Sequence, residues 1–177
     1  MKNLLKGAVL AVGLLAGVHA ANAQQKIGHV DAEEIFQLLP DVKSAQDQLK
    51  TLQDSKESDI KKMVDELTTK NNLAEEKYKN RSEANKATVD AELNTLGQEI
   101  QQMQSRIQEV SRVAQEDLQK KNQELMAPIQ TKLMNAINAV GKEKGYAYIF
   151  DIGSGAAIYY QGGEDVTADV KAKLGIK

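Results

Sequence analysis

The sequence predicts an α+β fold in which a long antiparallel helical hairpin is attached to a small β-sheet body. The stretch between Pro40 and Pro128, the only two prolines, is rich in Leu, Ile, Met, Ala, Gln, Glu and Lys and has a helical period. By contrast, five of the seven aromatic residues lie between Tyr146 and Tyr160, so we expect the compact core near the C-terminus. The predicted divisions are a leader at 1–23, body segments at 24–40 and 129–177, and the hairpin at 41–128.

The first 23 residues are predicted to be a cleaved signal peptide. Lys2 and Lys6 form a positively charged start, a short apolar run follows, and Ala21-Asn22-Ala23 fits the small-x-small cleavage pattern. A membrane anchor is the alternative, but about a dozen apolar residues are too few to span a bilayer. We therefore expect an exported protein whose mature chain begins after Ala23.

The mature chain is predicted to open with a strand at residues 26–31, a short apolar run of Lys-Ile-Gly-His-Val-Asp. Asp31 and Glu34 have the spacing of a capping box, in which each side chain satisfies a backbone N–H at the start of a helix. A short helix is expected over residues 32–39, because the residue before Pro40 disfavours helical geometry.

The hairpin is predicted from two apolar seams with steps of three and four residues, the period of a coiled coil. The second arm carries this seam at Leu96, Ile100, Met103, Ile107, Val110 and Ala114. The first arm carries it less regularly, at Val42, Ala45, Leu49, Leu52, Ile60, Met63, Leu67, Ala74 and Tyr78, with Lys56 and Asn71 in seam positions. Residues 79–86 have little to bury, so we expect the chain to reverse there and each arm to be about 60 Å long.

Beyond the hairpin, the sequence predicts a helix, two strands and a final helix. We expect a kink or break at Pro128 and a helix that continues to Gly141 or Gly145. Strands are expected at 146–151 and 156–160, joined by a hairpin turn at 152–155. Asp165 or Thr167 is expected to cap a last helix that carries Val170 and Leu174.

Composition argues against an enzyme and against nucleic-acid binding. The chain has no cysteine, and its net charge is −2 with both signs interspersed. His29, the one histidine of the mature chain, is interpreted as a packed or interfacial side chain, because partners for a metal or catalytic site are lacking. We interpret Asp31, Glu33 and Glu34 as a helix cap and Gly153-Ser154-Gly155 as a turn, so no catalytic residue, metal or cofactor is predicted.

A sheet of three short strands leaves edges exposed, and association with other copies is the simplest way to cover them. If several copies close their small sheets into one barrel-like base, the edges disappear and the hairpins project together. The apolar residues expected at this base are Ile27, Val30, Tyr148, Phe150, Ile158 and Tyr160.

The order of the predicted elements resembles that of the Skp/OmpH family of periplasmic chaperones. The resemblance begins with the signal peptide, Lys-Ile-Gly-His-Val-Asp at 26–31 and the Glu-Ile-Phe that follows, and continues through the hairpin. It ends with Tyr-Ala-Tyr-Ile-Phe-Asp at 146–151, a turn of small residues, Ala-Ile-Tyr-Tyr at 157–160 and Asp-Val-Thr-Ala-Asp-Val at 165–170. The resemblance implies a homotrimer with a β-barrel base and three arms around a cavity. It also implies an ATP-independent holdase that carries unfolded outer-membrane proteins through the periplasm.

Client contacts are expected from apolar residues of the arms, namely Met63, Leu67, Tyr78, Leu93, Leu96 and Met103. The methionines Met63, Met103, Met126 and Met134 suit a promiscuous apolar surface, but methionine at seam spacing is more often ordinary core. Family members that best match this description are strongly basic, whereas this chain is mildly acidic. We therefore assign no lipopolysaccharide-binding residues and leave contact with lipid open.

Two other classes of function remain at this point. One is a structural or adaptor protein whose coiled coil docks onto an envelope assembly; it predicts a folded, specific partner. The other is an exported hydrolase, for which the chain offers almost no residues. Protection of an unfolded client without nucleotide would distinguish the chaperone from both.

Overall fold

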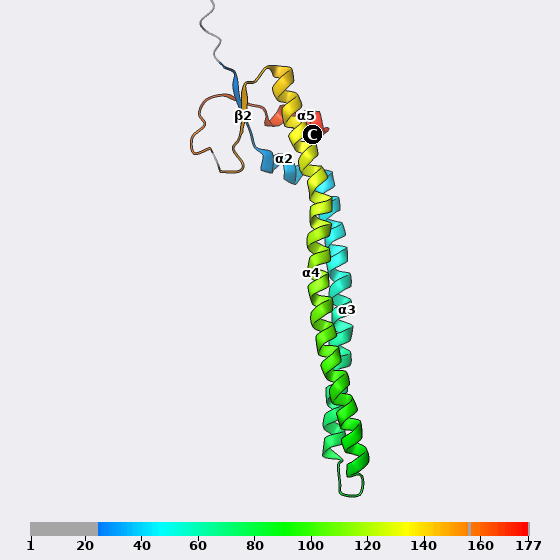
Figure 1. The fold of residues 1–177 in the computed structure, drawn as a ribbon. Helices are drawn as coiled ribbons and strands as arrows, with labels where there is room; N and C mark the ends of the chain where they lie inside the picture. The colour runs from blue at the N-terminus through cyan, green and yellow to red at the C-terminus, as the bar shows by residue number, and fades with distance from the viewer. Residues whose placement is uncertain (1–24, 156, 177) are drawn as a thin grey trace, which may run out of the picture. The chain divides into compact units, whose positions relative to one another are not determined.

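The computed structural model describes residues 25–155 and 157–176 (Figure 1). The predicted signal peptide lies outside these residues. The described residues divide into two compact units: an arm unit, Gln37–Lys132, and a body made of residues 25–36, 133–155 and 157–176. Among the described residues, no helix combines the length and the apolar character needed to cross a membrane.

The body contains a three-stranded sheet in the order β2-β1-β3. The central strand β1, Ile27–Val30, pairs in parallel with β2, Tyr148–Asp151, and with β3, Glu164–Asp165. His29 lies opposite Phe150 on one side and Asp165 on the other. The N-terminal strand therefore receives both neighbours from the C-terminal part of the chain.

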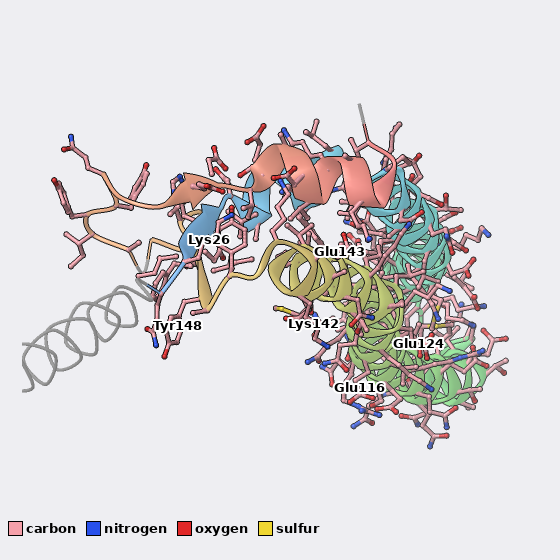
Figure 2. All side chains as sticks on the ribbon, turned by 90° about the horizontal axis from the view of Figure 1, so that it is seen from above. Lys26, Glu116, Glu124, Lys142, Glu143 and Tyr148 are labelled. Carbon is pink, nitrogen blue, oxygen red and sulfur yellow. The ribbon has the colours of Figure 1, made fainter. Side chains whose placement is uncertain are left out.

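The body core is formed by α2, Ala32–Leu38, α5, Thr167–Leu174, and the last turns of α4, Lys86–Lys144, against the sheet (Figure 2). Its buried residues are Val30, Ile35, Leu133, Ala136, Val140, Val166 and Val170. Most are aliphatic and β-branched, which suits the close packing of short helices on a pleated surface. Val30 is 1% exposed and packs in the chain's own core. Val30 is therefore not on an exposed oligomer-base surface, where it was predicted to lie.

The strand predicted at residues 156–160 is wrong for residues 157–160, the part of it that the structure describes. No strand forms at 157–160, and residues 152–155 do not close a hairpin. The sheet instead takes its third strand from Glu164–Asp165, which the sequence did not suggest. The run of Ile and Tyr at 158–160 favours an extended backbone. A strand also needs a neighbour, and none of the described strands pairs with residues 157–160.

The predicted cap of α2 is half right. The Glu34 backbone N–H donates to Oδ1 of Asp31 at 2.8 Å. The Glu34 side chain does not reach back; it forms an ion pair with Lys171 at 2.5 Å. The backbone N–H of Asp31 donates instead to Oγ1 of Thr167 at 3.0 Å.

Asp165 and Thr167, which were predicted as alternative caps of the last helix, have different roles. Oδ1 of Asp165 accepts the N–H of Thr167 at 2.9 Å and so supports the start of α5. The hydrogen bond from the Thr167 side chain, together with this one from the Thr167 backbone, lowers the pKa of Asp165. Thr167 is the first residue of the helix, and its side chain is used to hold Asp31.

The arm unit is an antiparallel hairpin of α3, Pro40–Lys79, and the first part of α4, Lys86–Lys144 (Figure 1). The predicted reversal between the arms is confirmed, because residues 80–85 lie between the two helices. The helix α4 runs through Pro128 without a break, contrary to one of the two expectations for that residue. It ends before Gly145, whose φ of 71° favours glycine.

Ion pairs join the two arms along their length. Lys56, in a seam position, contacts Asp117 at 2.6 Å, and nearer the reversal Lys70 contacts Glu99 at 2.7 Å. Further pairs are Lys77 with Glu92, Arg81 with Asp90 and Lys132 with Asp41. Because the seam between two helices is narrow, lysines flanking or replacing seam residues can cover it with their alkyl stems while their ammonium groups remain in water.

Candidate binding surfaces

An exposed apolar surface lies on the body beside the sheet. We call it the base surface and define it by Ile27, Tyr148, Phe150, Ile158, Tyr159 and Tyr160. Phe150 is 53% exposed and Ile158 is 99% exposed, which is unusual for side chains of this size. The rings of Tyr148 and Phe150 are stacked with centroids 6.2 Å apart.

A groove of about 1200 Å³ adjoins this surface and is bounded by β1, Phe150 and the segment 157–164. Ile27, Ile158, Tyr159 and Tyr160 give it an apolar lining. Five of the six residues predicted for the oligomer base are exposed here, and Val30 is the exception. Tyr159 was not among the predicted residues. In a strand, its side chain would point to the opposite face from those of Ile158 and Tyr160.

His29 lies at the edge of this groove and is one of its lining residues. Its ring is 5.5 Å from the ring of Tyr160, and its Nδ1 atom is buried without a hydrogen-bond partner in the described part of the chain. Within that part, no group of three or more His, Cys, Asp or Glu side chains is placed to hold a metal ion. A packed or interfacial role for His29 stays the prediction.

The first and last strands of the sheet are joined by a polar cluster. Lys26 contacts Glu164 at 3.1 Å and lies 4.3 Å from the ring centre of Tyr146, whose hydroxyl donates to Glu164. The hydrogen bonds from Tyr146 and Lys26 lower the pKa of Glu164. Figure 2 shows Lys26 and Tyr148 near the strands of the body, with Lys142 and Glu143 on the last turns of α4.

The residues predicted to bind a client on the arms divide into two groups. Met63, Leu67, Leu93 and Met103 are half-buried, and Leu96 is 8% exposed. These five residues therefore agree better with ordinary core packing between the arms than with a surface that contacts a client. Only Tyr78, which is 70% exposed, presents its side chain to solvent. Of the other methionines, Met126 is half-buried and Met134 is 57% exposed.

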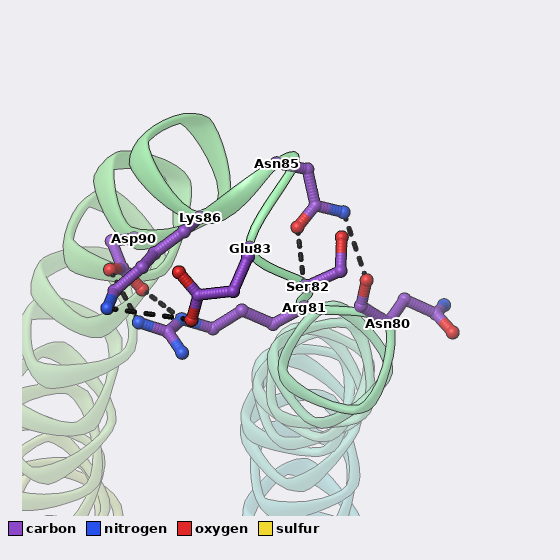
Figure 3. Close-up of polar contacts among 7 residues, drawn as sticks. All are labelled: Asn80, Arg81, Ser82, Glu83, Asn85, Lys86 and Asp90. Atoms are coloured by element: carbon purple, nitrogen blue, oxygen red, sulfur yellow. Dashed lines mark hydrogen bonds and ion pairs between the residues drawn. The ribbon is translucent and has the colours of Figure 1, made fainter.

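The reversal of the hairpin is closed by polar contacts (Figure 3). Arg81 donates to both carboxylate oxygens of Asp90, at 2.6 and 2.9 Å. These bonds hold the pKa of Asp90 below its usual range. The Asn85 side chain accepts the N–H of Ser82 at 2.7 Å and donates to the carbonyl of Asn80 at 3.0 Å. The tip is therefore a hydrogen-bonded turn with a defined geometry.

Comparison with known proteins identifies the family to which this arrangement corresponds. The model of the outer membrane protein (OmpH-like) family matches residues 26–174, which include both the body and the hairpin. The chain belongs to the OmpH-like family. It is also similar to the chaperone protein Skp of Pectobacterium atrosepticum, with 25% identity over 170 residues that cover 96% of this chain and 97% of the relative.

The chaperone protein Skp of Photorhabdus laumondii has the same identity and coverage. The resemblance noted in the sequence is thus confirmed at the level of the family. Membership of the OmpH-like family, with relatives named as chaperones, supports a periplasmic chaperone and makes the chain a non-enzymatic protein.

Proposed function

We propose that this protein is an ATP-independent holdase that binds unfolded outer-membrane proteins in the periplasm and prevents their aggregation. The observation that carries the proposal is the single family match from residue 26 to residue 174, because it includes the hairpin as well as the body. The names of the Skp relatives support the same activity. An adaptor with a folded partner is the alternative that the experiment below distinguishes.

The proposed working form is a homotrimer whose base surfaces meet. An exposed apolar patch of this kind is a recognised feature of association sites. The segment 157–160, with Ile158 and Tyr160, would then form its strand by pairing with the sheet of a neighbouring copy. This explains why a segment with strand character has no strand partner within the described residues of one chain. The three hairpins would enclose the cavity for the client.

Binding in this cavity is proposed to be diffuse. Seam residues of the arms are already used in self-packing, so apolar contact with the client falls to exposed side chains such as Tyr78. Each such contact contributes a fraction of a kcal/mol to about 2 kcal/mol, and the high effective concentration inside the cavity adds them together. A client is released when folding at the outer membrane yields more free energy than this sum, so no nucleotide is required.

The proposal is tested with the purified mature chain and a urea-denatured outer-membrane β-barrel protein that is diluted into buffer without nucleotide. We expect the protein at near-stoichiometric ratio to keep the client soluble, as followed by the turbidity of the solution. Aggregation at the rate seen without the protein, together with capture of a folded partner, would support the adaptor instead.

A further inference from the structure

One exposed face of α4 is nearly free of charge. Five glutamines, Gln98, Gln101, Gln108, Gln115 and Gln119, recur at steps of three, four and seven residues, and all five are exposed. Such steps keep side chains on one side of a helix in a coiled coil. We call this stripe the amide face. It lies away from the seam residues Leu96 and Ala114, which are buried between the arms.

Asn94 and Asn122 extend the amide face at its two ends, and Ser105 and Arg112 occupy the two positions left within it. Arg112 is its one charged residue. The guanidinium donates to Glu109 at 2.5 Å and also to Glu116, two carboxylates on the same helix. The hydrogen bond from Arg112 lowers the pKa of Glu109. The positive charge of Arg112 is more than offset by the two carboxylates beside it.

The absence of charge on this face is not explained by helix propensity. Glutamine, glutamate and lysine have nearly equal propensities, so a helix gains nothing from choosing glutamine. In this chain 27% of residues are charged, and most charged side chains of the arms lie in ion pairs. Uncharged amides at five spaced positions therefore point to a contact in which charge would be unfavourable.

The amide groups also keep their hydrogen-bonding capacity. None of the five glutamine side chains has a hydrogen-bond partner among residues 25–155 and 157–176. Each offers an acceptor oxygen and two N–H donors. A shallow groove of about 390 Å³ lies on this face, and its lining includes Gln98, Gln101 and Ser105. The face is therefore a row of unused donors and acceptors beside a depression.

We propose that the amide face binds the main chain of unfolded polypeptides. The electrostatic match selects this partner, because a peptide group, like a glutamine amide, is neutral and carries both a donor and an acceptor. From Asn94 to Asn122 the face is about 42 Å long, enough to lie along roughly 12 residues of extended chain. The inference rests on the proposed holdase function and names the part of the arm that contacts the client.

Recognition of the main chain accounts for binding without sequence preference. A face with net charge would favour clients of the opposite charge, whereas amides treat acidic and basic chains alike. Hydrogen bonds to the amides replace hydrogen bonds to water, so each contributes little and the client can be released. Aggregation-prone segments expose unpaired N–H and C=O groups, and these are the groups that the face would occupy.

The test compares two triple variants with the full mature chain. The face variant carries Gln101→Ala, Gln108→Ala and Gln115→Ala; the control carries Gln46→Ala, Gln48→Ala and Gln130→Ala, which are exposed positions away from the face. Neither changes the net charge, and alanine favours helix in both. The probes are a urea-unfolded outer-membrane β-barrel protein and a reduced, carboxymethylated polypeptide that stays unfolded, and Kd is measured by fluorescence anisotropy.

We expect the face variant to raise Kd for both probes by roughly tenfold, as three weak hydrogen bonds would predict, and the control to stay within about twofold of the wild type. Equal Kd values for the two variants would overturn the inference while leaving the holdase function standing. A loss of oligomer mass in the face variant would overturn it too, since the face would then bind a second copy. If the wild type binds neither probe, the holdase function fails first and the inference falls with it.

A third variant that introduces negative charge tests whether the amides are recognised because they are neutral. Changing the same three residues to glutamate, as Gln101→Glu, Gln108→Glu and Gln115→Glu, should weaken binding of an acidic unfolded chain more than binding of a basic one. The wild type is expected to bind the two with similar Kd values. A wild type that already prefers one charge would contradict recognition through neutral groups.

Discussion

Thr167 connects the two chain segments of the body through one hydrogen bond. Its side chain is 6% exposed, and its Oγ1 accepts the backbone N–H of Asp31, a residue from the opposite end of the chain. Thr167→Val keeps the shape but removes the hydroxyl, so the N–H of Asp31 loses its acceptor and Asp165 loses the hydrogen bond from the same side chain. We expect the free energy of unfolding to fall by about 1–3 kcal/mol in urea titrations.

Thr131→Val is the matched control for that substitution. Thr131 is exposed on α4, and its hydroxyl donates to the carbonyl of Ala127, which also has the option of bonding to water. The expected change is within about 0.5 kcal/mol. Equal losses in the two variants would mean that the hydrogen bond to Asp31 has no special role.

The Arg81–Asp90 pair predicts a pH dependence of the hairpin tip. The folded state lowers the pKa of Asp90, so the pair contributes stability above the pKa of an unfolded aspartate and loses it as the pH falls through the folded-state value. We expect the tip to loosen below about pH 4. The measurement is amide hydrogen exchange of Val89, which donates to the carbonyl of Asn85, compared above and below that pH after correction for the intrinsic pH dependence of exchange.

Asp90→Asn should accelerate that exchange, because it removes the charge that Arg81 binds. Asp54→Asn is its control, since Asp54 pairs with Lys50 on one exposed helix and joins no other segment. The same exchange rate at Val89 in Asp90→Asn and in the wild type would show that Asn85 and the turn hold the tip without the ion pair.

At the scale of elements, the regular parts of the fold were predictable and the pairings were not. The arms follow from a seam repeated over many residues, and the reversal at 80–85 follows from a segment with little to bury. The base residues were predicted from the exposed edges of a small sheet. The clustered aromatic residues were expected to form the core, but four of the five are exposed and the core is aliphatic. What failed depended on partners distant in sequence: β3 is a strand because Gly28 and His29 pair with it, while 157–160 has the right composition but no neighbour.

Gly97 and Gly145 give opposite predictions for the same substitution. Gly97 lies inside α4, and a Cβ there would meet nothing within 4 Å. Gly97→Ala is expected to raise the free energy of unfolding by roughly 0.5–1 kcal/mol, because alanine loses less entropy in a helix. Stiffer arms should also hold large clients less well, which the aggregation assay can measure.

Gly145→Ala should destabilise, although space around Gly145 is equally open. Its φ of 71° is a left-handed conformation that alanine adopts at a cost of roughly 1 kcal/mol or more. Thermal melts of both variants test this contrast. A stabilised Gly145→Ala would indicate that α4 can end in another way.

At the scale of the molecule, the base surface predicts an assembly that one charge can disrupt. We expect the wild type to have the mass of a trimer by light scattering and Phe150→Asp to be monomeric, because a carboxylate cannot be buried there without a partner. Tyr78→Asp, at an exposed aromatic of the arm, should remain trimeric. Circular dichroism should show unchanged helix in both variants, and a trimeric Phe150→Asp would exclude this surface as the interface.

The central position of β1 has a consequence for the order in which the molecule is completed. Ile27 and Gly28 precede the arms in the chain, whereas their strand partners Tyr148 and Glu164 follow the arms. The arms can pair before the sheet forms, and the Lys132–Asp41 contact brings the ends of that hairpin together. The entropic cost of joining the two chain ends is thereby reduced in advance. The arms should therefore form before the sheet when the unfolded chain folds.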